Sequence, residues 1–170
     1  MASRLNIKAT LQRWRHGMGF GVHSPFAFRF ITEVLNLPKI YGYYAYLYIA
    51  DERMRTLFRV INRLRPNKIS IPEKNKEIRA AVNSAVPHAT IVPMAEADMV
   101  ILDGRKQRKL AVDEIPDGAS LVVLNFSRWK NWQMYKAAMP AGMTFANRKE
   151  MAIAIPFSHL PRQDFDVKFK

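Results

Sequence analysis

The feature that most constrains the fold is an alternation of strands and helices that begins near Asn67 and ends in a hairpin. Predicted strands cover 68–71, 89–92, 98–102 and 120–124, and predicted helices cover 75–86, 106–114 and 128–139. The strands are continuously apolar rather than alternating, which indicates a parallel sheet with helices on both faces. Two further runs, "MTFAN" and "EMAIAI", predict an antiparallel hairpin, and "DFDVKFK" predicts an edge strand.

The N-terminal part of the chain is predicted to be helical and to pack on the sheet. Ser24 is a good N-cap and Pro25 suits the first helical position. A second helix is predicted over 51–64, which carries an apolar stripe at helical spacing. We therefore expect one structural domain, made of a helical extension over 1–66 and a sheet over 67–170.

The charge balance favours anionic partners. The chain has 27 Lys and Arg residues against 14 Asp and Glu, a net charge of +13, and such a field attracts polyanions. It contains no cysteine, which excludes disulfides and thiolate metal sites and fits an intracellular, cytoplasmic protein. No apolar run reaches the length of a membrane span.

Two basic segments are candidate sites for an anion or a nucleic acid. Arg55, Arg59 and Arg63 recur every four residues on the second predicted helix, and Arg105 and Lys106 follow the third predicted strand. Both sets would grip phosphates, although a row of this kind is more often a solvated helix face. A nucleic-acid-binding module predicts that both sets share one face and that affinity falls steeply with salt.

The bend after the first predicted strand contains no glycine. Its sequence is Pro72-Glu73-Lys74-Asn75. In nucleotide-binding α/β proteins this bend carries glycines, because the backbone must approach the ligand closely. Side chains with a Cβ atom, and a proline among them, would block that approach. No substitute for the glycine loop is visible nearby.

The chain resembles the class I methyltransferases, which use S-adenosylmethionine (SAM) and have a parallel α/β sheet closed by an antiparallel strand pair. More narrowly, it resembles a group of small bacterial SAM-dependent methyltransferases with an N-terminal HG-x-HSPF signature, matched here by "GVHSPF" at 21–26. The likeness continues in "ADMVILDG", "LVVLNFSRWK", "EMAIAIPF" and "RQDFDVKF". It implies a reduced Rossmann-like, three-layer α/β fold with a mostly parallel sheet and a C-terminal antiparallel hairpin.

The middle of the chain departs from this resemblance. Before the strand at 98–102, about one βα unit of the family pattern is missing. Two registers are open: 68–71 is either the first strand of the family without its glycines, or the second strand after deletion of the first. In the second register Glu73 matches the acid that binds the ribose of SAM. Alternatively, Glu73 is an acid that the helix dipole favours at a helix N-terminus.

Asp103 ends a strand at the edge of the sheet where doubly wound proteins bind ligands, and is a second cofactor candidate. Metal-dependent relatives of the fold bind a divalent cation here, but the following strand offers only Asn125, so no metal site is predicted. The alternative is a turn in which Asp103 caps the next helix. His23 and Asn125 complete the catalytic candidates, and His23 equally suits a residue that holds the loop to the helix start.

We interpret the chain as a methyltransferase-like protein that is defective in SAM binding and catalysis, and therefore works without a cofactor. An active methyltransferase with a rebuilt SAM site predicts instead a pocket lined by aromatic residues near Asp103 and Asn125. A third hypothesis is a basic nucleic-acid-binding or protein-interaction module. For the interaction module we expect a homo-oligomer across the sheet edge that the missing strands expose.

Overall fold

The computed structural model describes residues 22–37, 51–71, 75–147 and 150–168. They form a mixed α/β fold around a seven-stranded sheet of order β2-β1-β3-β4-β6-β5-β7. The strands are β1 (Lys68–Ser70), β2 (Thr90–Ile91), β3 (Met99–Asp103), β4 (Ser120–Leu124), β5 (Met143–Asn147), β6 (Met151–Ile155) and β7 (Gln163–Asp166). Strands β1 to β4 pair in parallel, and β6 pairs antiparallel to both β4 and β5. The predicted C-terminal hairpin is therefore confirmed.

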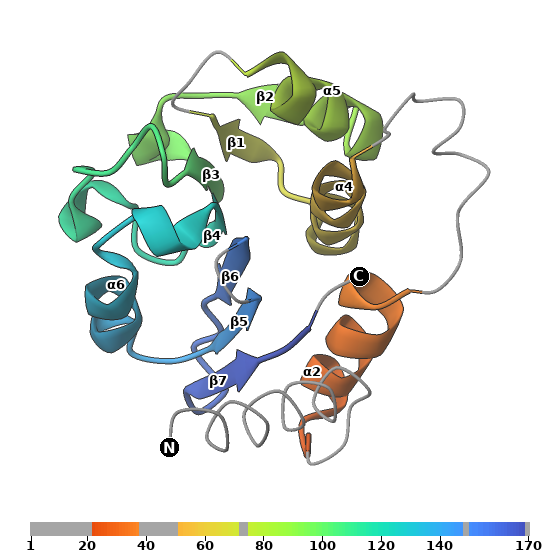
Figure 1. The fold of residues 1–170 in the computed structure, drawn as a ribbon, viewed down its shortest axis with the longest axis vertical. Helices are drawn as coiled ribbons and strands as arrows, with labels where there is room; N and C mark the ends of the chain where they lie inside the picture. The colour runs from red at the N-terminus through yellow and green to blue at the C-terminus, as the bar shows by residue number, and fades with distance from the viewer. Residues whose placement is uncertain (1–21, 38–50, 72–74, 148–149, 169–170) are drawn as a thin grey trace, which may run out of the picture.

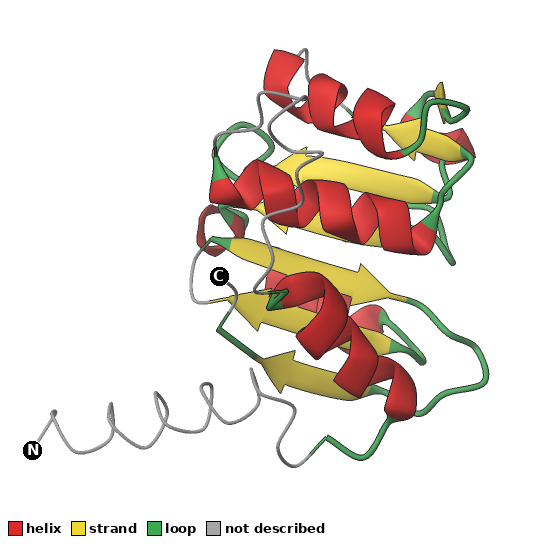
Figure 2. Cartoon of the chain, turned by 90° about the vertical axis from the view of Figure 1, so that its right-hand side faces the viewer, coloured by secondary structure: helices red, strands yellow, loops and turns green. Residues whose placement is uncertain are grey.

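The strands form a middle layer between two layers of helices (Figure 1). On one side lie α2 (Pro25–Arg29), the π-helix η1 (Phe30–Leu35), α4 (Glu52–Leu64) and α5 (Lys76–Ala85). Figure 2 shows these helices in front of the sheet. The other side carries α6 (Trp132–Ala138) and short 3-10 helices. The predicted three-layer, Rossmann-like arrangement is confirmed.

Side chains of the strands alternate between two apolar cores. Val122 and Leu124 of β4 face the core under α4, whereas Leu121 and Val123 face the core under α6. Because helices cover both faces of the sheet, the residues that point to either face are apolar. This explains the continuous apolar runs in the sequence.

Local capping sets where the long helices begin. The side chain of Ser24 accepts a hydrogen bond from the Ala27 amide, and that of Asp51 accepts one from the Arg53 amide. Asn75 caps α5 by accepting from the amides of Glu77 and Ile78. Each cap satisfies amides that have no partner inside the helix.

The sequence prediction of a basic helix over 106–114 is wrong. The chain there makes turns and a single 3-10 turn, η3 (Val112–Glu114). The carbonyl oxygen of Leu110, which a helix would use internally, accepts hydrogen bonds from Trp129 Nε1 at 3.1 Å and Asn131 Nδ2 at 2.7 Å. These contacts with a distant segment hold Leu110 outside a helix.

The last part of the chain follows the sequence prediction more closely. β7 lies at the edge of the sheet, parallel to β5. The predicted helix over 128–139 is shorter than expected, because the 3-10 turn η4 (Phe126–Arg128) precedes α6. None of the helices in the described ranges is long and apolar enough to cross a membrane.

Candidate functional site

The order of the strands places a switch point between β1 and β3. The chain adds β2 on one side of β1 and then crosses to the other side to form β3. In open α/β sheets, ligands bind at such a point, outside the carboxyl ends of the strands. Whichever family strand Lys68–Ser70 corresponds to, it lies between β2 and β3 in the sheet. The carboxyl ends of β1, β3 and β4 therefore form the candidate site.

Two predicted site residues, Asp103 and Asn125, meet at this edge. Asn125 Nδ2 donates a hydrogen bond to Asp103 Oδ1 at 2.9 Å, and the Arg105 amide donates to the same oxygen at 2.9 Å. The Asp103 amide in turn donates to the side chain of Gln107. The carboxylate of Asp103 thus organises a turn. It does not cap a helix, because the predicted helix is absent.

The turns after β3 and β4 are locked together at Gly104. The Gly104 amide donates to the carbonyl of Leu124 at 2.8 Å. A Cβ atom on Gly104 would lie 2.6 Å from the carbonyl oxygen of Asn125, closer than a side chain permits. Asn125 adopts a left-handed conformation with φ of 51°, which asparagine tolerates better than most residues. Because the backbones of these two turns pack closely, the side chains that they carry form the surface of the site.

A cavity of about 480 Å³ opens at this edge of the sheet, and we call it the edge cavity. Its lining residues are Arg53, Arg105, Asn125, Ser127, Arg128 and Glu150. Arg53 makes a two-pronged contact with the carboxylate of Asp51, at 2.9 and 3.2 Å. This hydrogen bond lowers the pKa of Asp51 and raises the pKa of Arg53.

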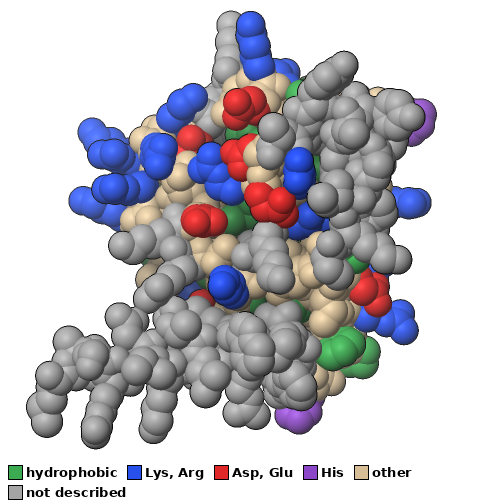
Figure 3. All heavy atoms as spheres, turned by 45° about the vertical axis from the view of Figure 1, so that its right-hand side comes forward, with side chains coloured by type: hydrophobic (Ala, Val, Ile, Leu, Met, Phe, Trp, Pro, Cys, Tyr) green, Lys and Arg blue, Asp and Glu red, His purple; other side chains and the backbone are tan. Residues whose placement is uncertain are grey.

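The basic row on α4 is not a uniform surface. Arg59 is buried, and its Nε donates to the carbonyl of Val34 at 2.6 Å. Arg55 is half-buried and pairs with Glu52 at 3.6 Å, whereas Arg63 is exposed. The side chain of Arg59 therefore fastens η1 to α4, and the three arginines do not form one face for phosphates. On the face seen in Figure 3, acidic side chains are interspersed among the basic ones.

The remaining predicted site residues are dispersed. His23 is exposed beside the cap of α2, and Lys106 is exposed in the turn after β3. Glu73 lies outside the described residues, as does Gly21 of the HSPF signature. Among the residues that the structure describes, no group of three or more His, Asp or Glu side chains could hold a metal ion.

Sequence reasoning missed Arg53, Arg128 and Glu150 as site residues. A signal for them existed, because α4 precedes β1 and runs back across the sheet, so its first turn lies at the carboxyl edge. Arg128 follows β4, and Glu150 directly precedes β6. Because β4 and β6 are antiparallel, both residues lie at that same edge. What the sequence could not supply was which of the many basic residues converge there.

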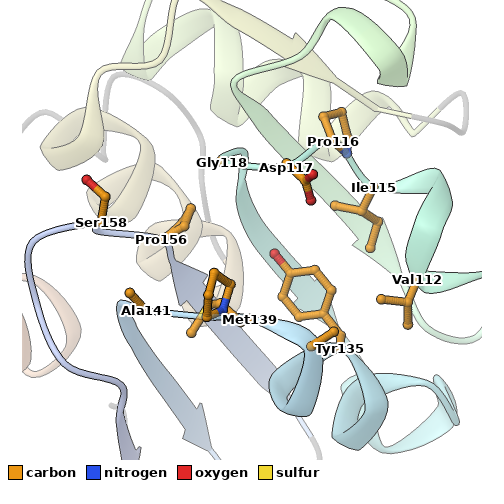
Figure 4. Close-up of a pocket in the computed structure, with 12 residues that line it drawn as sticks. Val112, Ile115, Pro116, Asp117, Gly118, Tyr135, Met139, Ala141, Pro156 and Ser158 are labelled. Atoms are coloured by element: carbon orange, nitrogen blue, oxygen red, sulfur yellow. The ribbon is translucent and has the colours of Figure 1, made fainter.

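A second cavity, of about 640 Å³, lies at the opposite edge of the sheet (Figure 4). Its lining is largely apolar, and the hydroxyl of Tyr135 and the carboxylate of Asp117 point into it. Burial, assisted by the charge of Asp117, raises the pKa of Tyr135 to about 12. This cavity sits at the amino ends of β4 and β5, away from the edge where this class of sheet binds ligands.

The sheet edge at β2 was expected to be covered by a partner. Both residues of β2 are exposed, and Ile91 keeps 38% of its surface accessible. The strand is short, and a proline lies close on either side of it, Pro87 before it and Pro93 after it. Since prolines lack amides and short strands offer few hydrogen bonds, this edge provides little for another strand to pair with.

Comparison with known proteins supports the fold. No protein-family model matches the chain, and no curated protein matches it. Among solved structures, it is similar to a methyltransferase from Geobacter sulfurreducens, with 11% sequence identity and a TM-score of 0.51. The match covers 72% of this chain and 92% of that one. At this identity the likeness concerns the fold alone, so the chain has a methyltransferase-like α/β fold.

Proposed function

We propose that this chain is a non-catalytic relative of the small methyltransferases with the HG-x-HSPF signature, and that it does not bind SAM in the manner of that fold. The observation that carries the proposal is the composition of the edge cavity, which opens at the ligand-binding edge of the sheet, beside the carboxyl ends of β3 and β4. Four of the six lining residues in the described part of the chain are charged, and none of those six is aromatic. Adenine and the methionine chain of SAM need apolar contact that these side chains do not offer.

The charge of the cavity also opposes SAM. The cofactor carries a sulfonium and an ammonium group against one carboxylate, so it is a net cation. Among the described residues, Arg53, Arg105 and Arg128 line the cavity together with one acid, Glu150. This excess of positive charge disfavours a cationic ligand. The residues present therefore do not fit SAM.

The start of α5 supports the same conclusion. In dinucleotide-binding folds, free amides at the start of the first helix face the ligand. Here the amides of Glu77 and Ile78 donate to the side chain of Asn75 at 3.0 and 3.1 Å. The helix satisfies its own amides, and the preceding bend has the sequence Pro72-Glu73-Lys74, without glycine.

If Lys68–Ser70 is the first strand of the family pattern, the ribose-binding acid should follow β2. In these folds an acid near the end of the second strand accepts the hydroxyls of the ribose. The residues after β2 are Val92-Pro93, followed by the 3-10 turn η2 (Met94–Glu96). Glu96, the first acid among them, is exposed. No acid therefore directly follows β2 in the described part of the chain.

The active alternative made a specific prediction, namely an aromatic pocket near Asp103 and Asn125. The cavity at Asn125 is polar instead. The nucleic-acid alternative required Arg55, Arg59 and Arg63 on one exposed face, and Arg59 is buried. Neither alternative has support comparable with that for a non-catalytic relative.

The test is calorimetric titration of the folded protein with SAM and with S-adenosylhomocysteine. We expect no heat of binding at millimolar ligand, from a sample that shows a cooperative unfolding transition. Micromolar binding of either ligand would overturn the proposal. Titrating the double variant Arg105→Gln/Arg128→Gln separates the two possible causes of exclusion, the positive charge of the cavity and the missing glycine loop. If charge alone excludes SAM, the double variant should bind SAM. If the missing glycine loop excludes SAM, the double variant should show no binding either.

A further inference from the structure

We propose that the edge cavity binds the phosphate group of a small phosphorylated compound. Its three arginines come from three different elements: Arg53 from the first turn of α4, Arg105 from the turn after β3, and Arg128 from η4 after β4. Guanidinium groups suit this ligand because their planar, forked donors match phosphate oxygens in pairs. The cavity lies at the ligand-binding edge of the sheet.

Two of the three arginines have their charge available. Arg53 is held by Asp51. In contrast, neither Arg105 nor Arg128 forms an ion pair with any residue in the described ranges. Both side chains are exposed. An incoming dianion would therefore meet two guanidinium groups that no protein carboxylate already occupies.

The acids near the cavity do not cancel this charge. Glu150 lines the cavity, and both it and Glu77 lie close enough to Arg53 to raise its pKa further. Asp103 already accepts hydrogen bonds from Asn125 and from the Arg105 amide. Among the described lining residues, Glu150 is thus the one carboxylate, beside three guanidinium groups.

The backbone beneath the two available arginines is fixed. The Arg105 amide binds Asp103 Oδ1, and the Arg128 amide donates to the carbonyl of Asn125 at 2.9 Å. Asp103 and Asn125 are joined to each other, and Gly104 packs between the two turns. Both arginines therefore belong to turns whose backbones are joined by hydrogen bonds. Such preorganisation lowers the entropy lost when a ligand orders the side chains.

The size of the cavity limits the ligand. A volume of about 480 Å³ suits a small molecule rather than a polymer. Ser127 adds a hydroxyl to the lining. This inference goes beyond the proposed function, and the two can fail separately, because one concerns SAM and the other a phosphate ester.

The experiment is calorimetric titration with inorganic phosphate and with ribose 5-phosphate, and with ribose as the uncharged control. We expect ribose 5-phosphate to bind and ribose not to bind. The variants Arg105→Gln and Arg128→Gln should each weaken binding by roughly tenfold or more, because each removes a charged hydrogen-bond donor. Arg63→Gln is the matched control, since it removes the same charge from the far end of α4.

A fourth variant tests the sign of the charge effect. Glu150→Gln removes the one carboxylate among the described lining residues, so inorganic phosphate should bind more tightly to this variant than to the unmodified protein. Absence of ribose 5-phosphate binding at millimolar concentration would overturn the inference. An equal loss of affinity for ribose 5-phosphate in Arg63→Gln and Arg105→Gln would also overturn the inference. That result would assign binding to the overall positive field of the protein.

Discussion

The two halves of the sheet differ in how completely they are built. In the C-terminal half, β3, β4, β5 and β6 each have five residues, and β3 pairs with β4 along its whole length. In the N-terminal half, β1 has three residues and β2 has two, both of them exposed. The C-terminal half of the sheet is therefore extensively paired, whereas the N-terminal half consists of short strands.

The reduction falls on the half that matters for a cofactor. In folds of this kind, the first two strands and the bend between the first strand and its helix supply most of the contacts to the adenosine. The core depends little on β2, whose two residues are exposed, whereas β3 to β6 bury side chains on both faces. Changes at β2 would therefore leave most of the core in place.

The largest expected difference between the halves concerns core truncation. Ile153→Ala in β6 removes a fully buried side chain and should lower the free energy of unfolding by about 2–5 kcal/mol. Ile91→Ala in β2 truncates a side chain that is 38% exposed, and should cost less than about 1 kcal/mol. Urea denaturation of both variants measures the two losses. Equal losses would show that the halves are equally well packed.

The next effect concerns the link between η1 and α4. Arg59 donates to the carbonyls of Val34 and Leu35 and to the hydroxyl of Thr56. Arg59→Gln would leave buried carbonyls without donors, so the free energy of unfolding should fall by about 1–3 kcal/mol. Arg63→Gln, on the exposed side of the same helix, should change it by about 0.5 kcal/mol or less. An unchanged stability in Arg59→Gln would remove the structural role of this side chain.

The smallest effect is a pH dependence in the C-terminal half. Burial alone would raise the pKa of Asp164, but hydrogen bonds from Thr144 and Lys136 outweigh it and lower the pKa below its ordinary value of 3.8. The folded state therefore gains stability above pH 3.8 and loses it as the pH falls through the lower folded value. Because the side chain is 39% exposed, the gain should stay below about 1 kcal/mol.

Melting temperatures at about pH 6 and about pH 3 test this contribution. The drop between the two conditions should be smaller in Asp164→Asn than in the unmodified protein, since the variant has no carboxylate to protonate. An identical drop in both proteins would mean that Asp164 contributes nothing to the acid sensitivity.

Local features of the fold were predictable from the sequence. Ser24, Asp51 and Asn75 begin helices because each side chain accepts from amides within the next few residues. The strands were equally visible, since burial on both faces makes them continuously apolar. These signals depend on neighbours in the sequence, and the sequence contains them directly.

Features that depend on distant contacts were not predictable. The four-residue spacing of Arg59 indicates a solvated face, yet its partners lie 24 and 25 residues away on η1. The turn at Leu110 exists because Trp129 and Asn131 donate to its carbonyl. For the candidate site, the sequence identified Asp103, Asn125 and Arg105, but not the convergence of Arg53 and Glu150 with them.

The most direct test of the account is native-state hydrogen exchange, measured with and without S-adenosylhomocysteine. We expect slow exchange in β3, β4 and β6, faster exchange in β1 and β2, and no change in either group when the ligand is added. Slower exchange at Ile69 and Ser70 in the presence of the ligand would contradict it. That result would mean that the reduced half of the sheet still holds a cofactor.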